Sequence, residues 1–123
     1  MKQPTNSTIQ IQVANIIGDV YAVEAEEGQK VYEIVKKAFE ENRKVILSFL
    51  NIEMMTTAFL NAAIGQLYSD FSEETVKERL RVENISESGK VLLKRVVDTA
   101  KLFYNDAATF QRMQQSINEI LNQ

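Results

Sequence analysis

The most regular hydrophobic pattern lies near the middle of the chain. The run Val-Ile-Leu-Ser-Phe-Leu at residues 45–50 has the length and composition of a strand buried on both faces. After a polar break at Asn51 and Glu53, apolar residues recur every three or four positions, which predicts a helix that begins at the pair Thr56 and Thr57. The apolar positions of this helix are Phe59, Leu60, Ala63, Ile64, Leu67 and Phe71.

The N-terminal third predicts a strand, a turn and a helix. Ile9, Ile11 and Val13 alternate with polar residues, as in a strand with one buried face. Gly18-Asp19 suits the tight turn of a hairpin, whose return strand would be residues 20–23. A clean amphipathic helix follows, with apolar positions at Val31, Ile34, Val35, Ala38 and Phe39.

The second half of the chain continues this alternation. Ser72 and the two glutamates after it predict the start of a short helix, and residues 81–85 predict a third strand. Ser86 or Ser88 caps the next helix. The apolar stripe of that helix consists of Leu92, Leu93, Val96, Val97, Ala100, Phe103 and Tyr104. Strands that alternate with helices predict an α/β fold, in which helices pack on a single-layer, mostly parallel sheet of three to five strands.

A last helix is predicted near the C-terminus. Its apolar seam is narrow and is formed by Phe110, Met113, Ile117 and Leu121, which neutral amide side chains surround. Such a seam suits a helix at the edge of a sheet or one paired with its own copy. Because neutral amides impose little repulsion between two copies, we expect a homodimer that contacts through these four residues.

Length and composition narrow the class of protein. A chain of 123 residues fits one domain, expected at residues 8–123, after a polar lead-in at residues 1–7 that carries the only proline and is expected to be disordered. The formal net charge of −3 does not indicate a strongly cationic nucleic-acid or membrane binder. Because cysteine and histidine are absent, thiol and imidazole chemistry are excluded and no metal or cofactor is predicted.

No apolar run has the length of a membrane span, and the N-terminus lacks the apolar core of a secretory signal. We therefore expect a cytoplasmic protein that does not bind membranes.

The central stretch VILSFLNIEMMTTAFLNAAIGQLY resembles the central segment of the STAS-like domains of unknown function, which are relatives of the STAS domains of anti-sigma-factor antagonists. The resemblance rests on the strand that ends at Phe49, the short polar turn, the threonine pair, Phe59 and the helix of small residues. It implies a STAS-like α/β fold and a non-enzymatic, regulatory role. The partner it implies is another protein, such as an ATP-binding kinase-like protein or an anti-sigma factor.

The same resemblance implies a docking surface on the loop before the helix and on its first turn. The residues of that surface are Asn51, Glu53, Met54, Met55, Thr56 and Thr57. Thr57 and Thr56 are the candidate phosphoacceptors, and the alternative is that one of them simply caps the helix. A phosphate at this position would meet unsatisfied backbone N–H groups and would change the charge of the docking surface.

The sequence leaves two alternative functions open. A basic face from Arg79 to Lys101 would suit a nucleic-acid-associated regulator, although nucleic-acid recognition calls for more positive charge with interleaved aromatic residues. A small enzyme with a carboxylate site would need two acidic groups held in a cleft, and no spacing of the acidic residues indicates one. Both functions are therefore less favoured alternatives to the regulatory role.

Overall fold

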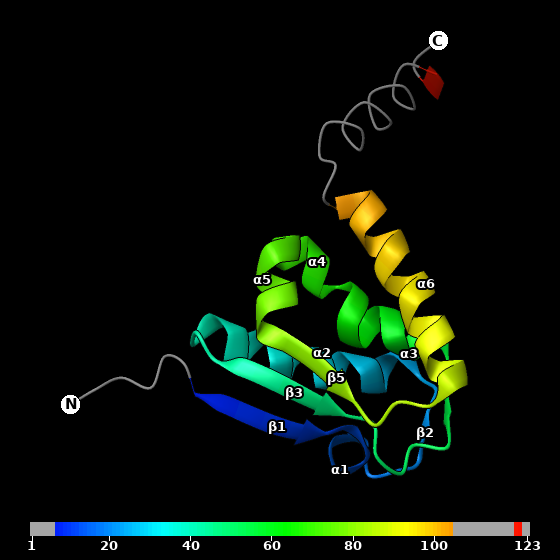
Figure 1. Cartoon of the computed structure of the whole chain (residues 1–123). Coiled ribbons are helices and arrows are strands. Elements are labelled where there is room, and N and C mark those ends of the chain that lie inside the picture. Colours follow the sequence, from blue (N-terminus) through cyan, green and yellow to red (C-terminus); the bar gives the residue numbers. More distant parts are fainter. Residues whose placement is uncertain (1–6, 105–119, 122–123) are drawn as a thin grey trace, which may run out of the picture.

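The structure is a computed structural model that describes residues 7–104 and 120–121 (Figure 1). The strands are β1 (Thr8–Gln12), β2 (Tyr21–Ala22), β3 (Lys44–Ser48), β4 (Met54–Met55) and β5 (Leu80–Glu83). The helices are α1 (Val13–Ile17), α2 (Ala25–Glu40), α3 (Thr57–Leu60), the π-helical segment η1 (Asn61–Gly65), α4 (Leu67–Asp70), α5 (Glu73–Arg79) and α6 (Glu87–Tyr104). All strand pairs are parallel, which confirms the predicted α/β class.

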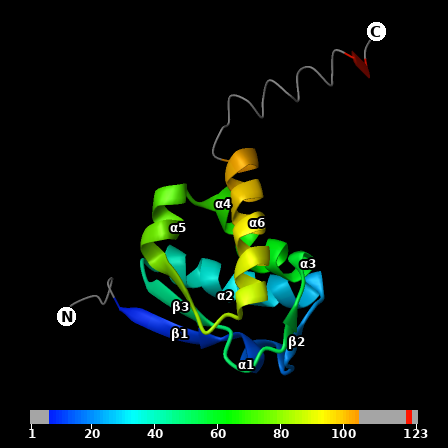
Figure 2. The same cartoon turned by 45° about the vertical axis from the view of Figure 1, so that its right-hand side comes forward.

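The main sheet has the order β1-β3-β5, with β3 in the centre. Helices α2 to α6 lie on one face of this sheet (Figures 1 and 2). The register places on that face the apolar residues Ile9, Ile11, Val45, Leu47, Leu80 and Val82. The prediction that the central strand is buried on both faces is wrong, because Ile46 on the opposite face is only half-buried and its neighbours there include Gln10 and Arg81.

The predicted N-terminal hairpin is also wrong. Val13 does not extend β1 but begins the short helix α1, in which Val13 and Ile17 are buried on one side. Gly18 ends that helix in the left-handed conformation, with φ of 68°. β2 then pairs in parallel with β4, which lies more than thirty residues later, instead of returning along β1. Gly18 therefore serves as the C-cap of a helix and not as part of a hairpin turn.

The core lies between the main sheet and α2, α3 and η1. Phe49 and Phe59, which the sequence placed in the core, are buried. α2 and α3 approach each other closely at Gly28, since a Cβ atom there would overlap the carbonyl oxygen of Phe59. Glycine at this position therefore allows the backbones of the two helices to come into direct contact.

Helix ends in the second half of the chain follow the predicted capping. Ser72 Oγ accepts a hydrogen bond from Thr75 N at 3.1 Å, and Ser86 Oγ accepts one from Gly89 N at 3.0 Å, so Ser86 rather than Ser88 caps α6. The predicted stripe of α6 is wrong at its end, because Phe103 is 46% exposed and Tyr104 is similarly open. The last turn of α6 extends beyond the helices it packs on (Figure 2).

The C-terminal prediction lies largely outside the described residues. Phe110, Met113 and Ile117 are not described, while Leu121 is described and exposed. Of the predicted lead-in, only Ser7 is described, and its carbonyl oxygen accepts a hydrogen bond from Lys44 N at 3.0 Å. In the part of the chain that the structure describes, no helix has the length and apolar character needed to cross a membrane.

Candidate functional site

The loop between β3 and β4 makes a tight turn at the carboxyl end of the sheet. Ile52 N donates to the carbonyl oxygen of Phe49 at 3.0 Å, and Asn51 adopts a left-handed backbone with φ of 69°. Asparagine tolerates this conformation better than most residues. Glu53 N then donates to the carbonyl oxygen of Val20 at 2.8 Å, which fixes the start of β4 beside β2.

β2 and β4 form a two-stranded sheet with an outer and an inner face. Tyr21 pairs with Met54 and Ala22 pairs with Met55. Paired residues share a face, and Tyr21 and Met54 are 50% and 54% exposed, so together they form an apolar patch at the surface. On the inner face Ala22 is buried, and Met55 lies so close to Gly89 that a Cβ there would come within 2.8 Å of its Cε atom. We call the exposed pair the Tyr21–Met54 patch.

The two candidate phosphoacceptors have different environments. The Thr56 hydroxyl accepts a hydrogen bond from Phe59 N at 3.1 Å and donates one to the carbonyl oxygen of Val23 at 2.6 Å. Thr56 is therefore the N-cap of α3 and also ties that helix to the chain after β2. Thr57 is the first helical residue and is half-buried, and its hydroxyl has no hydrogen-bond partner among the described residues.

A buried serine at the end of β3 forms hydrogen bonds with the loop that follows this strand. Ser48 is fully buried, and its hydroxyl oxygen accepts hydrogen bonds from Leu50 N at 3.2 Å and from Asn84 Nδ2 at 3.0 Å. These bonds join the loop after β3 to the loop after β5. Such bonds restrain the beginning of the loop that leads from β3 to β4.

The predicted docking surface is thus divided by the structure. Asn51, Glu53 and Met54 point to solvent, whereas Met55 and Thr56 are directed into contacts with the rest of the domain. The sequence-based prediction did not include Tyr21 as a neighbour of Met54. No local signal could have revealed it, because the two residues meet only through the pairing of β2 with β4.

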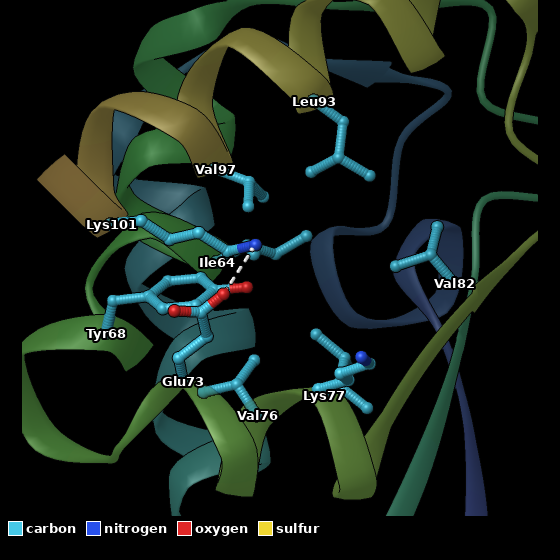
Figure 3. Close-up of a pocket in the computed structure, with 10 residues that line it drawn as sticks. Ile64, Tyr68, Glu73, Val76, Lys77, Val82, Leu93, Val97 and Lys101 are labelled. Carbon is cyan, nitrogen blue, oxygen red and sulfur yellow. Dashed lines mark ion pairs between the residues drawn. The ribbon is translucent and has the colours of Figure 1, made fainter. Parts of the chain in front are cut away.

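A hollow of about 350 Å³ lies beside β5, between α5 and α6 (Figure 3). Most of its wall is apolar and includes Ile64, Val82 and Leu93, and one end carries an ion pair between Glu73 Oε2 and Lys101 Nζ at 2.9 Å. The hydrogen bond to Glu73 raises the pKa of Lys101. Burial raises the pKa of the nearby Tyr68 phenol. Both groups therefore stay protonated near neutral pH and are not placed to exchange protons there.

The predicted basic face is interrupted by acidic partners. Lysines of α6 pair with carboxylates, as in Lys94 with Asp98 at 2.8 Å and Lys90 with Glu87 at 3.2 Å. The Arg79 guanidinium donates to the carbonyl oxygen of Phe39 at 2.7 Å and so joins α5 to the end of α2. These pairs lower the positive potential that a nucleic acid would need.

The carboxylates in the described part of the chain do not converge on one centre. Asp70 accepts a hydrogen bond from the Tyr32 hydroxyl and lies 3.9 Å from Lys36 Nζ, so it links α4 to α2. Burial, together with the Asp70 carboxylate, raises the pKa of Tyr32. Within the described ranges, no group of three or more acidic residues is arranged to hold a metal ion.

Comparison with known families agrees with this architecture. A family model described as a STAS-like domain of unknown function (DUF4325) matches residues 27–90, which is more than half of the chain. The matched range runs from the first turn of α2 to the first turn of α6 and contains the whole loop between β3 and α3. No curated protein and no solved structure matches the chain.

Proposed function

We propose that this chain, which belongs to the family of STAS-like domains, is a regulatory domain that binds another protein and has no catalytic activity of its own. The observation that carries the proposal is the Tyr21–Met54 patch, where two large side chains, an aromatic and an apolar one, lie exposed side by side on paired strands. Exposed apolar side chains on an ordered surface are typical of protein-binding sites. The absence of histidine and cysteine from the sequence also favours binding over catalysis.

The partner we propose is an ATP-binding, kinase-like protein or an anti-sigma factor. Support for this class comes from the match to STAS-like domains, a family related to the STAS domains of anti-sigma-factor antagonists. The docking surface consists of the Tyr21–Met54 patch, with Asn51, Glu53 and the first turn of α3 at its border. This surface is small, so it suits a transient regulatory contact better than a permanent one.

Phosphorylation, if this surface is switched, acts on Thr57 rather than on Thr56. A phosphate on Thr56 would break the cap and the bond to Val23, at a cost of about 0.5–2 kcal/mol for the cap alone. Thr57 can carry a phosphate without losing a hydrogen bond within the described structure. The added charge of about −1.5 to −2 would then lie in the first turn of α3, at the border of the docking surface.

The docking surface is tested by placing a charge in the patch. Full-length protein carrying Met54→Glu is compared with wild type for binding to a purified ATP-binding kinase-like protein or anti-sigma factor, and Leu102→Glu serves as the matched control. Leu102 is 71% exposed on α6, outside the patch. We expect Met54→Glu to weaken binding by about tenfold or more and Leu102→Glu to leave it unchanged. Equal binding by all three proteins would contradict this surface.

The switch is tested separately with Thr57→Glu. A carboxylate is tolerated in the first turn of a helix, so this variant should fold normally and bind the partner less tightly. Thr57→Ser is the control that keeps the hydroxyl. Intact mass spectrometry of protein from native cells should reveal a phosphorylated form. If none is found and the Glu variant binds normally, Thr57 is not a switch and the docking proposal stands without it.

A further inference from the structure

β5 is an outer strand of the main sheet, and no described strand pairs with its free edge (Figure 1). The carbonyl oxygen of Glu83 accepts a hydrogen bond from Phe49 N at 2.9 Å, so the peptide groups of Glu83 face β3. Peptide groups alternate in direction along a strand, which turns the N–H and C=O of Val82 outward. The free edge therefore presents backbone groups that another strand could pair with.

The side chains of β5 are complementary to a second copy of the same strand. Arg81 and Glu83 lie on the face of the sheet opposite α2 to α6, which we call the uncovered face. Their side chains are 72% and 39% exposed, and their charged atoms are 3.7 Å apart. If two β5 strands pair in antiparallel fashion about Val82, Arg81 lies opposite Glu83 of the partner subunit. The two-fold axis generates the same contact a second time.

This register is selected against its neighbours. A slip by one residue would place a side chain of the uncovered face opposite a side chain of the face that the helices cover. Directly opposed residues must share a face, so this register is excluded. A slip by two residues would set Arg81 against Arg81 of the partner subunit, or Glu83 against Glu83 of the partner subunit. Like charges directly opposed are destabilising, so only pairing about Val82 brings opposite charges together.

We propose that two copies of this chain associate through antiparallel pairing of their β5 strands. The two three-stranded sheets then form one continuous sheet, with the helices of both copies on the same side. The N–H and C=O groups of Arg81 and Glu83 point towards β3 of their own copy and not towards the second copy. The contact between Arg81 of one copy and Glu83 of the other is therefore a non-hydrogen-bonded pair, in which opposed side chains approach most closely. Half-buried apolar residues beside the hollow, such as Leu93 and Val97, lie close to this edge.

The free edge of β1, at the other side of the main sheet, carries no charges that would select one pairing register. The uncovered face of β1 carries Thr8, Gln10 and Gln12, which are neutral and fix no register by charge. The proposed contact also differs from the C-terminal seam of residues 110–121 that the sequence analysis favoured. The two contacts are distinguished below by their response to substitutions.

Charge reversal in full-length protein is the main test, with mass measured by light scattering across a dilution series. Arg81→Glu and Glu83→Arg should each raise the dimer dissociation constant by about tenfold or more, since each places like charges opposite each other twice. An equimolar mixture of these two variants should form a heterodimer, because every opposed pair is then of opposite charge. Gln10→Glu on β1 is the matched control and should leave the dimer unchanged.

A cross-link provides a second measurement that does not depend on charge. The chain has no cysteine, so Val82→Cys introduces one thiol. At a hydrogen-bonded antiparallel pair the two Cα atoms lie about 5.5 Å apart, within the range a disulfide spans. Mild oxidation should therefore link Val82→Cys protein into a covalent dimer, whereas Gln10→Cys protein should stay uncrosslinked.

Three results would overturn the proposal. They are a wild-type mass of one chain at every concentration, a dimer unaffected by Arg81→Glu, and failure of Val82→Cys to cross-link under conditions in which wild type is dimeric. A dimer that Ile117→Lys dissociates and Arg81→Glu does not would place the contact at the C-terminal seam. Circular dichroism of each variant confirms that it is folded before its mass is interpreted.

Discussion

α2 and α6 are the two long amphipathic helices of this domain, and they are buried to very different extents. Both lie on the same side of the main sheet (Figures 1 and 2). The buried residues of α2 are Gly28, Val31, Tyr32, Val35, Ala38 and Phe39. Those of the longer α6 are only Gly89, Val96 and Ala100, and Val91 is 59% exposed. Similar sequence patterns have therefore produced one central helix and one peripheral helix.

The difference follows from position in the topology. α2 directly precedes β3, the central strand of the main sheet, and packs against α3 and η1. α6 follows β5, the outer strand, and no described strand continues the sheet beyond it. The hollow beside β5 and the free strand edge both lie on the α6 side. We infer that the α2 side supplies most of the stability and that the α6 side is available for association.

The largest expected contrast is between Phe59 and Leu93. Phe59 is fully buried in the layer that α2 covers, so Phe59→Ala should cost about 3–5 kcal/mol of unfolding free energy. Leu93 on α6 is half-buried beside the hollow, so Leu93→Ala should cost only about 1–2 kcal/mol. Urea denaturation of both variants measures the difference. Equal losses would contradict the division between a central and a peripheral helix.

A second contrast compares two helical glycines. Gly28→Ala should destabilise by about 1–3 kcal/mol, because its Cβ would overlap the backbone oxygen of Phe59, which cannot move aside. At Gly65 a Cβ would lie 3.3 Å from Asn61 Oδ1 and 3.4 Å from Val96 Cγ1, on the side facing α6. There the gain in helix propensity, up to about 1 kcal/mol, offsets the crowding. Thermal melts should show a loss at Gly28 and little change at Gly65.

These contrasts also mark what the sequence could predict. The strand at β3, the amphipathic helix α2 and the cap at Ser72 depend on local pattern, and all three were predicted. The hairpin failed because β2 pairs with β4, and no local signal specifies a partner so far along the chain. The prediction that Ile46 is fully buried was wrong, since this residue is half-buried. An apolar run indicates a central strand, but it does not show whether helices cover one face of the strand or both.

The candidate site was predicted in the same uneven way. The segment containing Met54 and Thr56 was identified from its resemblance to a family. Residue type predicted a cap at Thr56 or Thr57, and the structure places it at Thr56. Tyr21 was missed, as was the pair of Glu73 with Lys101, because each contact joins residues distant in sequence. Spatial neighbours of this kind become visible only in the folded structure.

A third, smaller contrast compares the two adjacent threonines. Thr56→Ala removes a cap and leaves the carbonyl oxygen of Val23 without its donor, so it should cost about 1–2 kcal/mol. Thr57→Ala should change stability by no more than about 0.5 kcal/mol, because its hydroxyl bonds to no described group. Thr56→Ser keeps the hydroxyl and should recover most of the loss. If Thr57→Ala were the more destabilising variant, the assignment of the cap would be wrong.

The smallest expected effect is a dependence of stability on alkaline pH. Burial raises the pKa of Tyr68 above 10.0 in the folded state, and the hydrogen bond to Glu73 raises that of Lys101 above 10.5. A group whose pKa is raised by folding contributes stability that is complete below its unfolded pKa and is lost as the pH rises towards its folded pKa. Stability should therefore be constant from about pH 7 to pH 9.5 and should fall above about pH 10.

The two sides of the domain can be separated within this alkaline loss. Tyr32 on α2 has its pKa raised by burial and by Asp70, so Tyr32→Phe tests the central side, while Tyr68→Phe and Lys101→Met test the side facing α6. Lys101 is more than one third exposed, so its pair with Glu73 should contribute only a few tenths of a kcal/mol. We expect Tyr32→Phe to flatten the alkaline fall more than Lys101→Met, as measured by denaturant midpoints at pH 8 and pH 11. If Lys101→Met had the larger effect, the α6 side would be more rigidly held than its exposure indicates.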